Sequence, residues 1–475
     1  MSSKKEEAIH SSCDHAISYN LTAISPLDGR YAKKLTPLNT TMSEYGLINY
    51  RVLVEITWLK TICQHPLIRD TKLTNDELDY LNNISQSFDL NDAIKIKEIE
   101  QTTCHDIKAV EYFLQEKLKS HDSLHELIPL VHFAATSEDI NNLAYALMLK
   151  DGRNTLKQSL SAIIQTLSTM ASEHSTLAML ARTHGQAASP TTLGKELANV
   201  VYRLQREYNH FIECEITGSF NGAVGNYNAH TIAYPSINWL ELTQQFVEGF
   251  DLSFNPMTTQ IEPHDALAQL LDSLSRINTI LLDLNKDLWG YISLGYFSLK
   301  KQDSETGSST MPHKVNPIDF ENSEGNLGIA NALATHLARS LPISRWQRDL
   351  SDSTTLRNLG SIFGYSLLAY SSCLSGLNKL IPNKEAITKD LENKWETLAE
   401  AIQTILRSHG FDNAYEDLKL LTRGKVITKD LLHTWINQQE LPDAAKTKLL
   451  SLTPGNYTGI AAKLAVSYIN NKQQG

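Results

Sequence analysis

Apolar positions recur with helical spacing over two long segments of the chain. Residues 156–171 carry a stripe that includes leucines and isoleucines three and four positions apart, and a longer stripe runs through 267–292. Both patterns predict helices, and Asp265 is available as a cap near the start of the second. The second stripe exceeds the length of an ordinary globular helix, so it predicts a long bundle or a coiled-coil-like association.

Segments in which apolar and polar residues alternate, as in a β-strand, are scarce. The most turn-rich piece between predicted helices is 218–228, and Ser189-Pro190 resembles a helix start, with Ser as the cap and Pro at the first helical position. We therefore predict an all-α, mainly helical chain with a long central bundle. Domain boundaries are placed near residues 125 and 378. Because long bundles commonly associate, a homo-oligomer is expected.

One stretch without charge, 358–378, is long enough to be considered as a membrane span. Its five serines and three glycines make it polar and small for a lipid-facing helix. A buried core helix is the better interpretation.

The composition is that of an ordinary globular protein, with 475 residues, 41% hydrophobic and 20% charged. A net charge of −10 argues against a general binder of nucleic acid or of membrane surfaces. An anionic substrate would require locally clustered cations. The five cysteines lack CxxC spacing, which favours reduced thiols in a cytoplasmic protein over disulfides or a zinc site. Residues 1–20 have no apolar core of a signal peptide and are predicted to form a polar tail.

The segment GSSTMPHKVN at 307–316 concentrates hydrogen-bonding side chains between backbone-directing residues. Gly307 permits unusual backbone angles, and the prolines interrupt regular structure. Ser308, Lys314 and Asn316 stand in this short span. A solvated surface loop is the simpler interpretation of an isolated stretch of this kind.

Two other segments carry candidate chemistry. RTHGQAASPTTLG at 182–194 places His184 in polar surroundings, although an isolated histidine is more often structural. TSEDINN at 136–142 predicts a helix N-terminus, with Thr136 or Ser137 as the cap and acidic residues at the positive end of the dipole. A helix N-terminus is also a site for a carboxylate.

Cations stand in three further segments: DGRY at 28–31, HDIK at 105–108 and RWQRD at 345–349, which leads into a run of hydroxyl residues and Arg357. Arginine forks with hydroxyls suit a phosphate, although such a run is more often a solvated helix face with internal ion pairs. The sequence has no GxxxxGK[ST], no GxGxxG after a clear strand and no HExxH. His125 and His132 have no third ligand at a suitable spacing, so we predict no metal and no dinucleotide.

The three motif segments resemble the fumarase/aspartase superfamily, whose signature G-S-x-x-M-P-x-K-x-N is matched at every fixed position of 307–316. Within it the chain resembles the adenylosuccinate lyases of the longer bacterial type, through pieces such as SPLDGRY at 25–31, HDIKAVEYF at 105–113 and HFAATSEDINN at 132–142. The resemblance implies a cofactor-free carbon–nitrogen lyase that releases fumarate from adenylosuccinate, giving AMP, and from succinyl-aminoimidazole-carboxamide ribotide. It also implies three helical domains (21–125, 126–378 and 379–475) and a homotetramer with shared active sites.

The resemblance also implies residue roles. His184 would be the general acid and Ser308 the general base, with Lys314 stabilising the carbanion. His105 would assist His184 or bind phosphate. The residue before it is Cys104, where close relatives have an asparagine. The implied substrate contacts are Arg30, Tyr31, Asp106, Thr136, Ser137, Gln260, Asn316, Arg348, Ser353, Thr354 and Arg357.

Two alternatives remain. Another member of the superfamily, such as an argininosuccinate lyase, a fumarase or an aspartase, would share the motifs, although SEDINN and DFENSEGN favour the purine branch. A non-catalytic helical scaffold would have kept the fold alone. His184, Ser308 and Lys314 are all present, which favours an enzyme.

Overall fold

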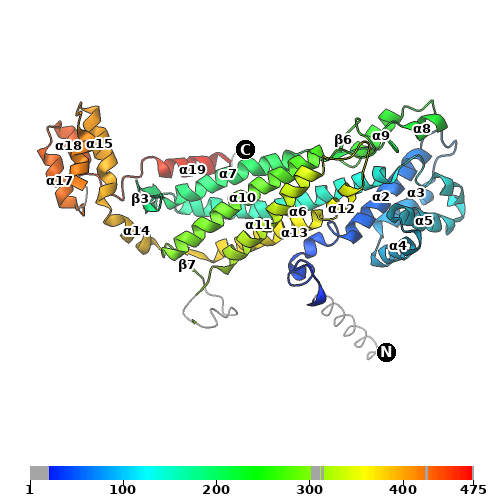
Figure 1. The fold of residues 1–475 in the computed structure, drawn as a ribbon, viewed down its shortest axis with the longest axis horizontal. Helices are drawn as coiled ribbons and strands as arrows, with labels where there is room; N and C mark the ends of the chain where they lie inside the picture. Colours follow the sequence, from blue (N-terminus) through cyan, green and yellow to red (C-terminus); the bar gives the residue numbers. More distant parts are fainter. Residues whose placement is uncertain (1–20, 301–310, 312–314, 423–425, 473–475) are drawn as a thin grey trace. The chain divides into compact units, whose positions relative to one another are not determined.

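The computed structural model describes residues 21–300, 311, 315–422 and 426–472 of the chain (Figure 1). It divides into two compact units. Unit 1 comprises Met1–Ser159, Tyr208–Thr279 and Gly325–Ala369, and unit 2 comprises Leu160–Glu207, Ile280–Glu324 and Tyr370–Gly475. The division falls within five helices: α6 (Ser137–Glu173), α7 (Leu193–Glu213), α10 (Asp265–Ser293), α11 (Ile318–Ser340) and α13 (Leu359–Lys379).

Unit 1 opens with a group of helices that pack on one another. The elements wholly within this unit are η1 (Ala32–Lys34), η2 (Thr36–Leu38), α2 (Glu44–Cys63), α3 (Asn75–Gln86), α4 (Leu90–Thr103), α5 (Asp106–Lys119), η3 (Asp122–Leu130), β5 (Thr217–Gly218), α8 (Asn228–Ala233), α9 (Trp239–Glu248), β6 (Ser253–Phe254) and α12 (Ser351–Leu356). Side chains of Ser43, Thr74, Asp89 and His105 accept main-chain N–H bonds at the starts of α2 to α5. These caps fix where each helix begins.

The core of unit 1 is organised around Trp58, whose side chain is fully buried. Its ring lies 4.1 Å from that of Phe220 and 5.1 Å from that of Phe246. The indole N–H donates to the main-chain oxygen of Phe133 at 2.9 Å. The aromatic core therefore also holds the turn that leads into α6.

Unit 2 contains short strand pairs and a separate group of C-terminal helices. Its remaining elements are β1 (Ala178–Met179), β2 (Arg182–Thr183), β3 (Gln186–Ala187), β4 (Thr191–Thr192), β7 (Phe297–Leu299), β8 (Leu380–Pro382), α14 (Lys384–Glu392), η4 (Trp395–Leu398), α15 (Ala399–Ser408), α16 (Ala414–Thr422), α17 (Lys429–Gln438), α18 (Asp443–Leu450) and α19 (Ala461–Lys472). The pairs β1–β4, β2–β3 and β7–β8 are antiparallel, whereas β5–β6 of unit 1 is parallel. Buried leucines and isoleucines of α15 to α18 form one apolar cluster.

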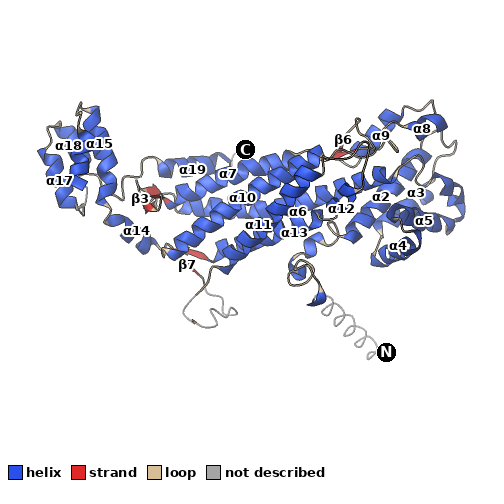
Figure 2. Ribbon diagram, viewed as in Figure 1, coloured by secondary structure: helices blue, strands red, loops and turns tan. Residues whose placement is uncertain are grey.

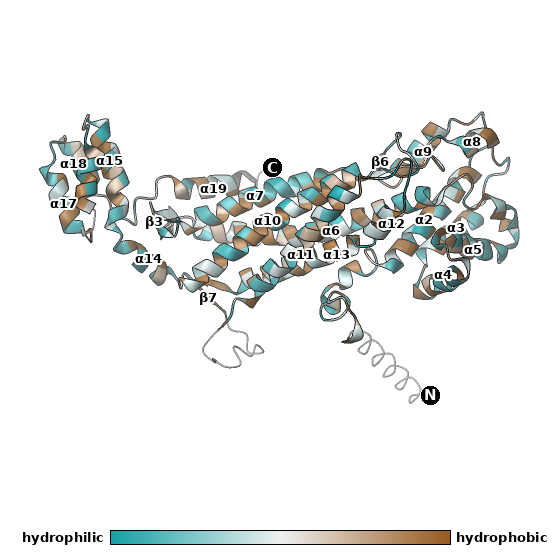
Figure 3. Cartoon of the chain, in the orientation of Figure 1, coloured by the Kyte–Doolittle hydropathy of each residue, from teal (hydrophilic) through white to brown (hydrophobic). Residues whose placement is uncertain are grey.

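The predicted all-α class is confirmed, since every strand in the described part of the chain has two or three residues (Figure 2). The stripe at 267–292 lies in α10, and that at 156–171 lies in α6. Apolar and polar residues alternate around these helices (Figure 3). The segment 358–378 corresponds to α13, a largely buried helix, and no described helix has the length and hydropathy to cross a membrane.

The predicted helix start at Ser189-Pro190 is wrong. Thr191 and Thr192 pair with β1 as strand β4, and α7 begins at Leu193. The hydroxyl of Thr192 accepts the main-chain N–H of Lys195 at 3.2 Å. The helix therefore begins only after the strand pair, where Thr192 caps it.

Candidate active site

The N-terminus of α6 is fixed by a buried carboxylate. Asp139 accepts the N–H of Thr136 at 2.8 Å and those of Asn221 at 2.8 Å and Gly222 at 3.1 Å. The predicted helix N-terminus in TSEDINN is therefore confirmed, with α6 beginning at Ser137. Thr136 and Ser137 are both partly exposed at this rigid, electropositive helix end.

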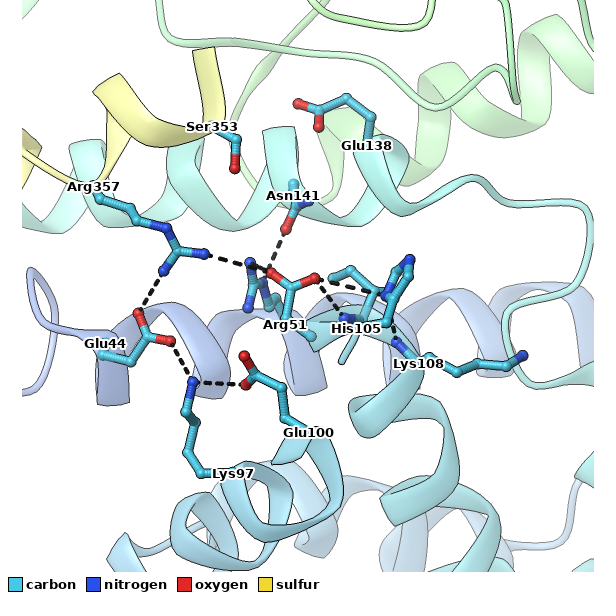
Figure 4. A network of polar contacts seen from close by, with 12 residues as sticks. Glu44, Arg51, Lys97, Glu100, His105, Lys108, Glu138, Asn141, Ser353 and Arg357 are labelled. Carbon is cyan, nitrogen blue, oxygen red and sulfur yellow. Dashed lines mark hydrogen bonds and ion pairs between the residues drawn. The ribbon is translucent and has the colours of Figure 1, made fainter. Parts of the chain in front are cut away.

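A buried arginine of α2 joins two other segments (Figure 4). Arg51 donates from Nη2 to Asp106 Oδ2 at 2.6 Å and from Nε to Asn141 Oδ1 at 2.9 Å. Burial alone would raise the pKa of the Asp106 carboxyl, but the charge of Arg51 and the N–H of Ile107 hold it below its ordinary value. Asp106 is therefore a fixed carboxylate at the start of α5.

His105 is the N-cap of α5 and is exposed. Its Nδ1 accepts the N–H of Lys108 at 3.2 Å and lies 3.7 Å from Asp106 Oδ1. Because Nδ1 is an acceptor, the neutral imidazole carries its proton on Nε2. Cys104 precedes it with φ +51°, a left-handed conformation that ends α4 and turns the chain into α5.

Arg357 ends α12 and faces two carboxylates. Its Nη1 lies 3.2 Å from Glu44 Oε2 and its Nη2 lies 3.8 Å from Asp106 Oδ2 (Figure 4). Ser353 and Thr354 belong to the same short helix. Asp106 is thus shared between a buried arginine and an exposed one.

Arg348 is held in a more enclosed place. Its Nη2 pairs with Glu138 Oε2 at 3.1 Å, and its Nη1 donates to Gln260 Oε1 at 3.1 Å. Burial raises the pKa of Glu138 to about 7, although Arg348 acts in the opposite direction. The nearby Arg345 is exposed and pairs with Asp349, as expected of a solvated run, so the two arginines of 345–349 differ in kind.

A cavity of about 360 Å³ opens beside Arg357 within unit 1. Its wall is formed by residues of 25–47, 145–148 and 356–364, which include Asp28, Glu44 and Ser361. This volume lies in the range of small-molecule sites. Arg30, which is exposed, and Tyr31 follow Asp28 in the chain.

The remaining predicted residues belong elsewhere. His184 is exposed at the tip of the β2–β3 hairpin of unit 2, with φ +52° followed by φ +73° at Gly185, as a two-residue type I′ turn requires. Arg182 anchors this hairpin through Tyr296, whose hydroxyl lies 2.9 Å from its guanidinium, and through Asp390. Asn316, also of unit 2, directly precedes Pro317 and α11. Ser308 and Lys314 lie outside the described residues.

Sequence reasoning missed four residues that organise this site: Arg51, Glu44, Glu138 and Asn141. A signal for Arg51 existed, because Arg51 and Glu55 are the charged residues of 45–59, an otherwise mostly apolar run. Two isolated charges in a buried helix indicate specific partners. Among the described residues, no group of three or more His, Cys, Asp or Glu side chains is arranged to hold a metal.

Comparison with known protein families gives two matches that together cover most of the chain. Residues 29–331 match a family described as "Lyase", and residues 344–458 match one described as "Adenylosuccinate lyase C-terminal". These matches include every predicted site residue, with the motif segments 182–194 and 307–316 inside the first.

Similar curated proteins extend over nearly the full chain. An adenylosuccinate lyase of Vibrio cholerae is 50% identical over 447 residues, covering 94% of this chain and 98% of the relative. One of Escherichia coli K12 is 50% identical over 444 residues, covering 93% and 97%. Among solved structures, a fumarate lyase from Mesorhizobium has a TM-score of 0.74 at 18% identity, covering 91% of this chain and 97% of the other. A 3-carboxy-cis,cis-muconate lactonizing enzyme from Pseudomonas putida has a TM-score of 0.72 at 18% identity, covering 92% and 97%, so both share the fold.

Proposed function

Because the chain belongs to the adenylosuccinate lyase family, we propose that it cleaves adenylosuccinate into AMP and fumarate. The matching cleavage of succinyl-aminoimidazole-carboxamide ribotide is the second reaction, in purine nucleotide synthesis. The observation that carries the proposal is the 50% identity to an adenylosuccinate lyase over 94% of this chain and 98% of that relative.

The reaction is a β-elimination. A base removes a weakly acidic proton from the carbon beside a carboxylate, and an acid protonates the departing nitrogen. We assign the base to Ser308 and the acid to His184. Lys314 supplies positive charge where the carbanion spreads into the carboxylate, and Asn316, Thr136 and the α6 N-terminus hold the fumaryl part.

The nucleotide end is assigned to unit 1. Arg357 borders the cavity and presents an exposed guanidinium, which can form paired hydrogen bonds with a phosphate. Arg348, which is more enclosed and is held by Glu138 and Gln260, is assigned to the phosphate as well. Arg30, Tyr31, Ser353 and Thr354 add hydrogen bonds to the ribose phosphate, and Ser137 and Gln260 complete the fumaryl contacts.

His105 is assigned to substrate binding through Nε2. Its Nδ1 is occupied by the N–H of Lys108, so Nε2–H is the group that can donate to a phosphate or to a proton relay with His184.

Fumarate release tests the proposal directly. Wild-type protein should release fumarate from adenylosuccinate, whereas Ser308→Ala and His184→Ala should abolish turnover and retain AMP binding. Full activity in either variant would remove that residue from the mechanism. Rapid cleavage of argininosuccinate with no turnover of adenylosuccinate would refute the assigned substrate.

We also propose a homotetramer with shared active sites and a cytoplasmic location. The family resemblance supports the assembly, as does the exposure of His184 on its hairpin. Complementation tests it: mixing inactive Ser308→Ala and His184→Ala proteins should restore activity if one site draws these residues from different subunits. Domain boundaries near 125 and 378 are part of the same proposal.

A further inference from the structure

The two carboxylates that face Arg357 differ in how firmly they are held. Asp106 receives Arg51 at 2.6 Å and the N–H of Ile107 at 2.9 Å, so its orientation is fixed. Among the described residues, the carboxyl of Glu44 contacts two cations, Arg357 at 3.2 Å and Lys97 at 3.3 Å. Glu44 is therefore the carboxylate that can change partner.

Glu44 and its partners are also exposed enough to move. The side chains of Glu44, Arg357 and Lys97 are 42%, 45% and 43% exposed. Ion pairs at such exposure contribute little, whereas an arginine that binds phosphate with two hydrogen bonds makes a stronger contact. Both side chains line a cavity of about 360 Å³, so a phosphate in that cavity can reach Arg357.

Lys97 is the second ion-pair partner of Glu44. It lies on α4 and pairs with Glu100 at 2.6 Å as well as with Glu44 (Figure 4). Burial acts against its charge, but the bonds to Glu100 and Glu44 raise the pKa of Lys97 above its ordinary value. Lys97 therefore remains a cation that can keep Glu44 after Arg357 is released.

The charges of this ion-pair network balance when the site is empty, and Asp28 adds one more carboxylate to the cavity wall. The three cations Arg51, Lys97 and Arg357 face the three carboxylates Glu44, Glu100 and Asp106. An entering phosphate adds negative charge, so binding is favoured when one carboxylate withdraws from Arg357.

We propose that Glu44 sets the affinity of this site for phosphate by an exchange at Arg357: in the empty site Glu44 bridges Arg357 and Lys97, and a bound phosphate replaces it at Arg357 so that Glu44 keeps Lys97 alone. The inference rests on the proposed function, because it takes Arg357 as the phosphate contact. Glu44 and Lys97 are then affinity-determining residues that act through Arg357.

Binding of AMP and of adenosine to the full-length protein tests the exchange by calorimetry in phosphate-free buffer. Glu44→Gln should lower the Kd for AMP about three- to tenfold, because a like charge is removed beside the phosphate. Its Kd for adenosine should stay unchanged. Lys97→Gln should raise the Kd for AMP, because Glu44 then has Arg357 as its partner, and the double variant should bind like Glu44→Gln.

Matched controls separate exchange from simple changes in net charge. Lys95, on the same helix and also 43% exposed, pairs with Glu116 and does not contact Arg357. Lys95→Gln and Glu116→Gln should leave the Kd for AMP within about twofold of wild type. Glu44→Asp keeps the charge but shortens the reach, and should tighten AMP binding by less than Glu44→Gln; this variant decides if Glu44→Gln fails to fold.

Weaker AMP binding by Glu44→Gln would show that Glu44 holds Arg357 in place and would overturn the proposal, as would unchanged binding. If Arg357→Gln loses AMP affinity while Glu44→Gln is unchanged, the proposed function stands and the exchange falls. If wild-type protein binds no AMP, both fall.

Discussion

Replacing Glu138 by Gln should change how the stability of the protein depends on pH. Glu138 is 3% exposed and pairs with Arg348 at 3.1 Å. The amide of Gln has nearly the same shape and its oxygen can still accept from Arg348, but it cannot ionise. The substitution therefore removes one titration and leaves the packing in place.

The size of the effect follows from the raised pKa. Burial moves the pKa of Glu138 from an ordinary 4.5 to about 7. Between these values the unfolded chain has lost the proton and the folded chain keeps it, so the free energy of unfolding falls as pH rises. The loss is about 1.4 kcal/mol per pH unit, on the order of 3 kcal/mol over the window, and is constant above it.

The assay compares urea unfolding of wild type and Glu138→Gln from pH 4.5 to 8. The stability of the variant relative to wild type should rise through the window and then level off near pH 7. The ion pair with Arg348 forms only when Glu138 is ionised in the folded chain, so its effect is already contained in the raised pKa. A change in packing adds an offset that does not depend on pH, so the slope is the test. Glu98→Gln, at an exposed position of α4, should give a curve parallel to wild type.

Parallel curves for wild type and Glu138→Gln would refute the reasoning, because they would show that Glu138 ionises alike in the folded and unfolded chains. Arg348→Met provides a second check. Without the arginine the pKa of Glu138 should rise further, so the fall in stability should extend to higher pH.

Three further predictions concern other parts of the chain. Arg51→Met leaves Asp106 and Asn141 without their buried hydrogen-bond donor, so it should lower the free energy of unfolding in urea by about 2–4 kcal/mol. It should also raise KM for adenylosuccinate, and a KM equal to that of wild type would contradict the site geometry. Burial opposes the charge on His132, but its 2.6 Å bond to Glu55 raises the pKa, so this stabilisation is present below the ordinary histidine pKa and lost as pH rises through the raised value. Glu55→Gln should therefore cost more stability at pH 6 than at pH 9, and an equal cost at both would refute the pairing. Gly360→Ala would place Cβ 2.3 Å from a main-chain oxygen and should lose about 1–3 kcal/mol, whereas Gly290→Ala, with no described atom within 4 Å of its Cβ, should gain up to about 1 kcal/mol.

The helical architecture was predictable because it follows from spacing along the chain. The stripe of 267–292 needs a buried face wherever its partners lie, and α10 spans it. The error at Ser189-Pro190 has a different origin. Pairing of Thr191 and Thr192 with β1 depends on residues more than ten positions away, and no local propensity contains that information.

The site residues also differ in whether local sequence could predict them. Thr136 and Ser137 could be found from sequence because a helix N-terminus is a local property, confirmed by the bond from Thr136 to Asp139. Arg345 and Arg348 could not be distinguished from sequence, since both are cations in the same polar run. Arg345 finds its carboxylate four residues on, whereas Arg348 finds Glu138 more than two hundred residues back in the chain.

The residues that the motifs omit are those that connect segments. Arg51 has no motif of its own, yet it contacts both Asp106, the first residue of α5, and Asn141, the fifth residue of α6. A motif fixes which groups can react or bind, but a buried charge with distant partners fixes where they stand. For that reason, substitutions of Arg51 and Glu138 are expected to alter substrate binding and pH response while every motif residue remains in place.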